Sequence, residues 1–95
     1  MPARMLQTHE LQQCVEAIAT RHPDRPRLSP GSADYDVLDT DRYCRVFIRN
    51  QANERITAGT EYVTYVVSLT PAKATVVGQF LSRRRADGED ETVVP

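Results

Sequence analysis

The sequence has no tryptophan, only two cysteines and no long uncharged hydrophobic run. The lack of about 18 consecutive apolar residues excludes a membrane-spanning helix. Two cysteines outside any Cys-x-x-Cys motif do not form a disulfide framework and are ordinary for a reduced cytosolic protein. The first ten residues, MPARMLQTHE, also lack the apolar stretch of a secretory signal. We therefore expect a cytoplasmic location and no contact with a membrane.

An excess of charge of one sign is also absent. The chain of 95 residues contains 12 basic and 13 acidic residues, and its formal net charge is -1. This balance removes the simplest argument for a nucleic-acid-binding protein, which is a strongly basic domain. A chain of this length suits one domain, residues 1–95, with one modest hydrophobic core. With six aromatic residues, that core has to consist mainly of valine, isoleucine, leucine and alanine.

An amphipathic helix is predicted for residues 6–22, because apolar side chains recur there with a period of 3.6 residues. Pro23 disfavours helical geometry at the residue before it and is expected to end the helix. Residues 23–33 contain three prolines and one glycine and are predicted to form a loop. The apolar positions of the helix are Leu11, Cys14, Val15 and Ile18.

Two later segments alternate between apolar and polar side chains, as half-buried strands do. They are residues 42–49 and residues 61–69, both rich in β-branched and aromatic residues, and we expect them to form a hairpin. Residues 35–38 form a further candidate strand. Because aspartates surround this segment and aspartate is a poor strand former, the strand is expected to be short and at an edge.

A second helix is predicted for residues 71–86. Thr70 suits the N-cap, Pro71 suits the first helical position and Gly88 suits the end of the helix. The helical stripe would consist of Ala72, Val76, Val77, Phe80 and Leu81. The β-branched residues 75–77 and Gly78 favour a strand instead for part of this segment, and that alternative stays open.

The expected fold class is therefore α+β. The single domain would consist of a helix, an antiparallel sheet of two or three strands and a second helix, with both helices on one face of the sheet. The core would span about residues 6–86, and residues 87–95 would form a mobile tail. Arginines 83–85 would lie in the last helical turn, where the acidic residues that follow would neutralise them.

The sheet face opposite the helices is the candidate functional site, because aromatic side chains and arginines alternate on it. The predicted partner-binding residues are Tyr43, Arg45, Phe47, Arg49 and Tyr62. Tyrosine, phenylalanine and arginine are enriched in protein interfaces. The same residues suit a single-stranded nucleic acid, whose bases stack on rings and whose phosphates bind guanidinium groups. A third interpretation is strand propensity alone, with Arg45 and Arg49 paired to nearby aspartates.

No combination of residues indicates catalysis or metal binding. His9 and His22 lie near opposite ends of the first predicted helix and cannot share one ion. The aspartates at 34–41 do not complete a calcium loop, because Leu38 and Asp39 stand where that loop needs an oxygen ligand and a glycine. We expect no nucleophile–base pair, no catalytic residues, no metal and no cofactor, and hence no enzyme activity.

The resulting hypothesis is a small non-enzymatic protein-binding regulator, adaptor or inhibitor that acts through the open face of its sheet. Compact inhibitors encoded by phages or other mobile elements fit this profile, as do bacterial accessory proteins. The alternative is a nucleic-acid-binding module that uses the same face. A homodimer is compatible with both.

Overall fold

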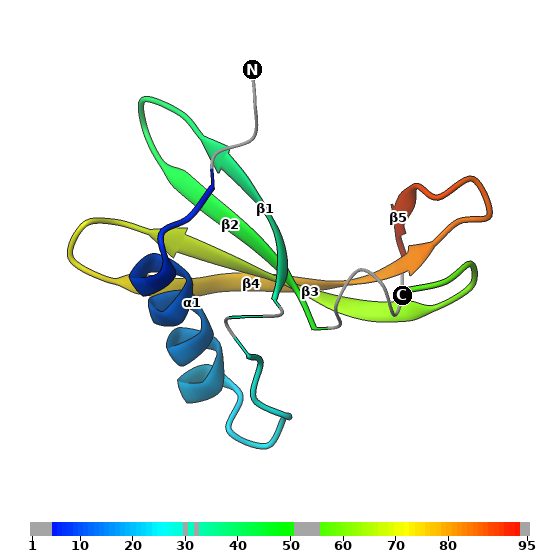
Figure 1. Cartoon of the computed structure of the whole chain (residues 1–95), viewed down its shortest axis with the longest axis horizontal. Helices are drawn as coiled ribbons and strands as arrows, with labels where there is room; N and C mark the ends of the chain where they lie inside the picture. Colours follow the sequence, from blue (N-terminus) through cyan, green and yellow to red (C-terminus); the bar gives the residue numbers. More distant parts are fainter. Residues whose placement is uncertain (1–4, 30, 32, 51–55, 94–95) are drawn as a thin grey trace.

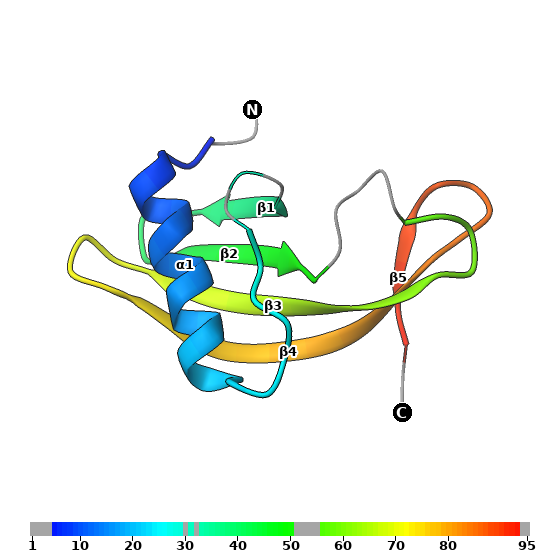
Figure 2. The same ribbon diagram turned by 60° about the horizontal axis from the view of Figure 1, so that its bottom comes forward.

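The computed structural model describes residues 5–29, 31, 33–50 and 56–93. Within them the chain forms one helix and five strands: α1 (Thr8–Arg21), β1 (Asp34–Asp39), β2 (Cys44–Arg49), β3 (Glu61–Leu69), β4 (Ala74–Arg84) and β5 (Asp90–Thr92). The strands form one antiparallel sheet in the order β1-β2-β3-β4-β5, so that each pairs with its neighbour along the chain. Figures 1 and 2 show a strongly curled sheet, with α1 against one end and β5 at the other.

The expected helix–sheet–helix architecture is wrong. The protein is mostly β: one short helix packs on a five-stranded antiparallel half-barrel, and residues expected to form the second helix belong to β4. Strand β5 lies in residues 87–95, the expected mobile tail, and pairs with β4. The first helix, the hairpin of β2 and β3 and a short edge strand around residues 35–38 are confirmed.

A β-bulge in β4 explains the false helical period. Val66 is opposite Gly78, whereas Val67 is opposite Val76, so Val77 is an extra residue in the ladder. A bulge of this kind interrupts the two-residue alternation of a strand. On the two sides of the bulge the apolar positions therefore fall at spacings close to those of a helix, although the backbone is extended throughout.

The turn before β4 explains the false helix start. Thr70 accepts a hydrogen bond from the Lys73 amide through its hydroxyl oxygen, and its own amide donates to the Lys73 carbonyl. Thr40 makes the same two contacts with Tyr43 in the turn between β1 and β2. A threonine hydroxyl can accept a hydrogen bond from a nearby backbone amide both in a turn and at a helix N-cap. A threonine before an element therefore does not distinguish a turn from the start of a helix. Gly88 has a φ of 87° in the β4–β5 turn, not at a helix end.

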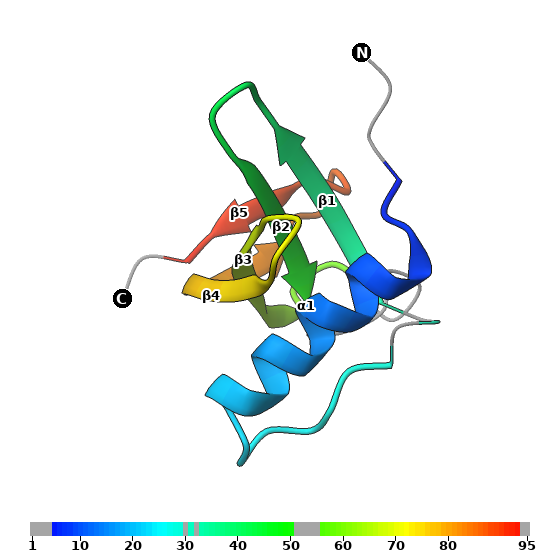
Figure 3. The same cartoon turned by 90° about the vertical axis from the view of Figure 1, so that its left-hand side faces the viewer.

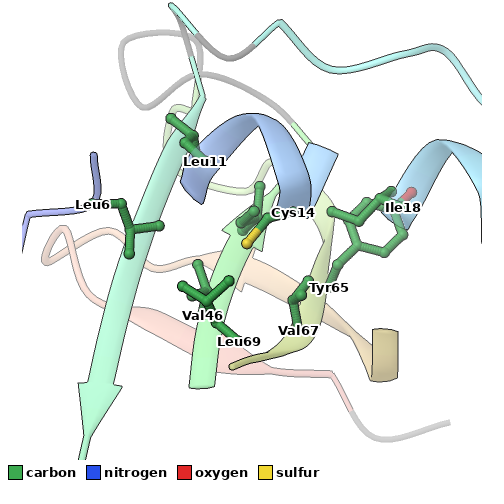
Figure 4. Packing of buried hydrophobic residues seen from close by; sticks show 9 residues of the cluster. Leu6, Leu11, Cys14, Ile18, Val46, Tyr65, Val67 and Leu69 are labelled. Carbon is green, nitrogen blue, oxygen red and sulfur yellow. The ribbon is translucent and has the colours of Figure 1, made fainter. Parts of the chain in front are cut away.

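The main hydrophobic core lies between α1 and one face of the sheet. Figure 4 shows side chains of α1 meeting those of β2 and β3 in this layer. Burial, together with the nearby Cys44 and Glu10, raises the pKa of the Cys14 thiol to about 12, so this cysteine is a packing residue and is not reactive. The cluster consists of Leu6, Leu11, Cys14, Ile18, Val46, Ile48, Tyr65, Val67 and Leu69.

Candidate functional site

The sheet face opposite α1, which we call the outer face, carries the side chains that the sequence analysis selected. Directly opposed residues of an antiparallel sheet share a face. Phe47 is in register with Asp36 on β1 and Val66 on β3, and Arg49 is in register with Asp34 and Thr64. Because Val46 and Ile48, which alternate with these residues, belong to the core under α1, the outer face is the one that α1 leaves uncovered (Figure 3).

The outer face has two parts with different surroundings. The part near β5, which we call the curled half, contains Arg49, Tyr62, Thr64, Ser82, Arg84 and Asp90. The part near the β1–β2 turn, which we call the open half, contains Leu38, Tyr43, Arg45, Phe47 and Val66. Three residues of the curled half are buried although no helix covers them, namely Tyr62, Thr64 and Ser82.

An ion-pair network closes the curled half. Arg49 donates a hydrogen bond to Asp36 (2.6 Å) and contacts Asp34 (3.4 Å) and Asp90 (3.5 Å). Asp90 on β5 also accepts a hydrogen bond from Arg84 (2.5 Å). The Arg49 side chain is only 17% exposed. Arg49 therefore links the first strands of the sheet to the last strand and holds the curl closed.

Two carboxyl groups of this network, those of Asp34 and Asp90, have pKa values that are shifted in opposite directions. Burial tends to raise the pKa of Asp90, but the Tyr62 hydroxyl and the guanidinium groups of Arg84 and Arg49 outweigh it, and the pKa is lowered. Burial raises the pKa of Asp34, against the lowering effect of Arg49. Among the described residues, the buried Tyr62 hydroxyl has no well-aligned hydrogen bond to its polar neighbours.

Two of the five predicted partner-binding residues, Arg49 and Tyr62, therefore make contacts that stabilise the fold. Tyr62 is 2% exposed, and Arg49 is held by three aspartates, which is the pairing that the third interpretation of the sequence expected for it. Sequence reasoning missed Asp90, the third of these aspartates. No local signal could have found it, because it is 41 residues from Arg49 and reaches it only through the curl of the sheet.

The other three predicted residues lie together in the open half. The Arg45 guanidinium carbon is 4.9 Å from the centre of the Tyr43 ring, a cation–π contact, and Phe47 lies beyond Arg45 on the same strand. Tyr43 is 42% exposed and Leu38, opposite Arg45, is 46% exposed. Gly78 lies in the row of Phe47 and Val66, and a Cβ atom there would meet nothing within 4 Å. This part of the sheet therefore presents apolar and aromatic surface around one arginine.

Two shallow cavities flank these surfaces. One, of about 220 Å³, lies on the outer face and is lined by Phe47 and Phe80 together with residues of the curled half such as Tyr62, so Phe47 borders both halves. The other, of about 430 Å³, lies at the start of α1 and includes His9, Asp39 and Cys44. Among the residues that the structure describes, no group of three histidine, cysteine or acidic side chains could hold a metal ion.

Arginines 83–85 lie in β4 and the residue after it, not in a helix. Arg83 contacts Glu61 and Glu91, and Arg85 contacts Asp87. The expected neutralisation of this run by acidic neighbours is confirmed.

In the described part of the chain, no helix is long and apolar enough to span a bilayer.

Comparison of the chain with protein-family models, curated proteins and solved structures gave no match.

Proposed function

We propose that this protein is a non-enzymatic binding protein that recognises another protein through the open half of its outer face. The observation that carries this proposal is the exposure of apolar and aromatic side chains on the sheet face that α1 does not cover. Tyr43 and Leu38 lie there beside Arg45 and Phe47. Aromatic residues and arginine are the side chains that contribute most to protein interfaces.

The arrangement of Arg45 supports this role. Its guanidinium group stacks on the Tyr43 ring, which orders a long side chain before a partner arrives. A side chain that is already ordered loses less conformational entropy on binding than a mobile one. The pair therefore offers a planar, charged centre surrounded by apolar surface.

Nucleic acid is the less well supported ligand. Arg49 and Arg84, which a phosphate backbone would need, are engaged by Asp34, Asp36 and Asp90. The Asp36 side chain is also 64% exposed beside Phe47, where it would repel a phosphate. Arg45, together with the exposed Arg42 of the β1–β2 turn, is thus left to supply positive charge near the open half.

A pair of matched variants tests the proposal. The double variant Arg45→Glu, Phe47→Ala should lose the proteins that the wild type captures from an extract of its own cells. Arg21→Glu makes the same charge reversal on the exposed end of α1 and should retain them. Circular dichroism must show that both variants are folded. Capture of the same proteins by the folded double variant would contradict the proposal.

Fluorescence anisotropy separates the two ligand classes. Labelled single- and double-stranded DNA and RNA should give flat traces at about 50 and 200 mM salt, because few phosphate contacts are available. Tight binding that weakens steeply with salt and disappears in Arg45→Glu would instead establish a nucleic-acid-binding face.

A further inference from the structure

The outer edge of β1 carries backbone groups that do not pair with β2, and the register identifies them. The Thr40 amide donates to the Tyr43 carbonyl (2.9 Å), so this pair is hydrogen-bonded across the turn. Hydrogen-bonded and non-hydrogen-bonded pairs alternate along an antiparallel ladder. The pairs that exchange bonds with β2 are therefore Leu38–Arg45, Asp36–Phe47 and Asp34–Arg49. It follows that the N–H and C=O groups of Tyr35 and Val37 point away from β2, toward the edge.

The neighbouring ladder gives an independent check. The Asn50 amide donates to the Val63 carbonyl (2.9 Å), so the bonded pairs between β2 and β3 involve Ile48 and Val46. These residues of β2 alternate with the ones that bond to β1, as they must in a regular sheet.

No described segment pairs with this edge through its backbone, although the Leu6 amide donates a hydrogen bond to the Tyr35 hydroxyl beside it (3.1 Å). Strand β1 is the last strand on its side of the sheet, and none of the described residues outside β2 forms a backbone hydrogen bond with Tyr35 or Val37. The opposite edge is different, since β5 covers only Ser82–Arg84 of β4 and the bulge at Val77 interrupts the rest of that strand. A long edge strand with free backbone groups is a template for another strand.

The charge of β1 selects among possible strands. Three of its six residues are aspartates, and it has no basic residue. Asp36 lies on the outer face and is well exposed. Pairing β1 with β1 of a second copy would bring four carboxylates, Asp34 and Asp36 of each copy, together on the outer face beside only two Arg49 guanidinium groups, which is less favourable than pairing with a basic strand. A strand with lysine or arginine on its outer face would instead meet Asp36 with opposite charge.

We propose that β1 accepts an extended segment of a partner protein as a sixth strand, and that this segment alternates basic with apolar side chains. The basic side chains would lie on the outer face near Asp36. The apolar ones would lie on the other face, beside the half-buried side chains of Tyr35 and Val37. The added strand would extend the outer face next to Leu38 in the open half. This inference therefore rests on the proposed protein-binding function and names the chemistry of the partner.

Amide hydrogen exchange measured residue by residue tests the edge directly. In the free protein the amides of Tyr35 and Val37 should exchange rapidly, and those of Asp36 and Leu38 slowly. Addition of a synthetic seven-residue peptide of alternating lysine and valine should slow exchange at Tyr35 and Val37 by about tenfold or more, which corresponds to about 1.4 kcal/mol.

Two control peptides separate the contributions to binding. The same peptide with glutamate in place of lysine should not bind, because its charge matches that of β1. The lysine peptide with two adjacent central amides N-methylated should also fail, because methylation blocks both edges of the strand. Binding of the methylated peptide with unchanged affinity would show that backbone pairing is not involved and would overturn the inference.

Protein variants test the charge. Asp36→Lys should weaken binding of the lysine peptide by about tenfold or more. Asp87→Lys places the same charge change on the exposed β4–β5 turn and should have no effect. If Asp36→Lys does not fold, Asp36→Asn should still show a weaker loss. Equal binding by a folded Asp36 variant and the wild type would overturn the inference.

The remaining outcomes identify other occupants. Slow exchange at Tyr35 and Val37 in the free protein at every concentration would mean that another part of the chain covers the edge. Slow exchange that appears only as concentration rises would mean that a second copy does. Either result overturns this inference. The proposed function would still stand if Arg45→Glu, Phe47→Ala abolishes capture of the partner, and it fails separately if that variant retains it.

Discussion

The two halves of the outer face have similar side chains with different roles. Each contains a tyrosine and an arginine, and Arg45 and Arg49 are four residues apart on the same side of β2. In the curled half, Arg49 contacts three aspartates and Tyr62 is buried. In the open half, Arg45 stacks on an exposed Tyr43. The alternation of a strand therefore sets which face a side chain is on, and the curvature of the sheet sets whether that side chain stabilises the fold or remains available to a partner.

The two tyrosines should differ most in stability experiments. Tyr62→Ala removes a buried ring and should lower the free energy of unfolding by about 3–5 kcal/mol, because the surrounding residues cannot fill the space. Tyr43→Ala should lower it by less than about 1 kcal/mol, because that ring is exposed. Urea denaturation monitored by circular dichroism measures both. Equal losses of stability would show that the Tyr62 ring is not tightly packed in the curled half.

The two arginines should differ less. Arg49→Met keeps the length of the side chain but leaves the carboxylates of Asp34, Asp36 and Asp90 without their shared cation, and should cost about 2 kcal/mol. Arg45→Met should change stability by no more than about 0.5 kcal/mol. The same denaturation experiment compares them. A neutral Arg49→Met variant would mean that the network does not hold the curl.

Two of the three aspartates beside Arg49, Asp34 and Asp90, should give opposite pH dependences. The pKa of Asp90 is lowered in the folded state, so its contribution to stability is present above the unfolded value, near 3.8, and is lost as the pH falls below it. The pKa of Asp34 is raised, so its contribution is present below 3.8 and is lost as the pH rises through the raised value.

Unfolding measured between about pH 2 and pH 6 checks these signs. As the pH rises, Asp90→Asn should lose stability relative to the wild type, and this loss should occur in the range below pH 3.8. Asp34→Asn should become more stable relative to the wild type, with the change above pH 3.8. Parallel curves for the two variants would show that the two carboxyls do not have opposite environments.

Gly78→Ala should have the smallest effect. A Cβ atom at this position meets nothing within 4 Å, and Gly78 does not have a positive φ. The substitution reduces the freedom of the unfolded chain, so stability should stay the same or rise by about 0.5 kcal/mol in a thermal denaturation experiment. A loss of more than about 1 kcal/mol would mean that the bulge in β4 needs glycine.

Local sequence signals correctly predicted the helix and strands whose spacing of apolar residues fits only one type of secondary structure. The helical period of α1 and the alternation of β2 and β3 have no competing signal nearby, and these three elements were expected. The segment that became β4 combined a threonine and a proline before it with apolar spacings that suit a helix. There the same Thr70 hydroxyl served a turn, and the bulge at Val77 changed the spacing of an extended strand.

The local pattern of β2 was enough to predict which of its residues face the core and which face outward, because side chains of a strand alternate with a period of two. The sequence also determined that the arginines of β4 have acidic neighbours. That Arg49 and Tyr62 belong to a closed network while Tyr43 and Arg45 do not depends on the three-dimensional fold. Asp90 is far from Arg49 along the chain and reaches it because successive antiparallel pairings and the curl of the sheet bring β5 back across the outer face, an approach that no local pattern encodes.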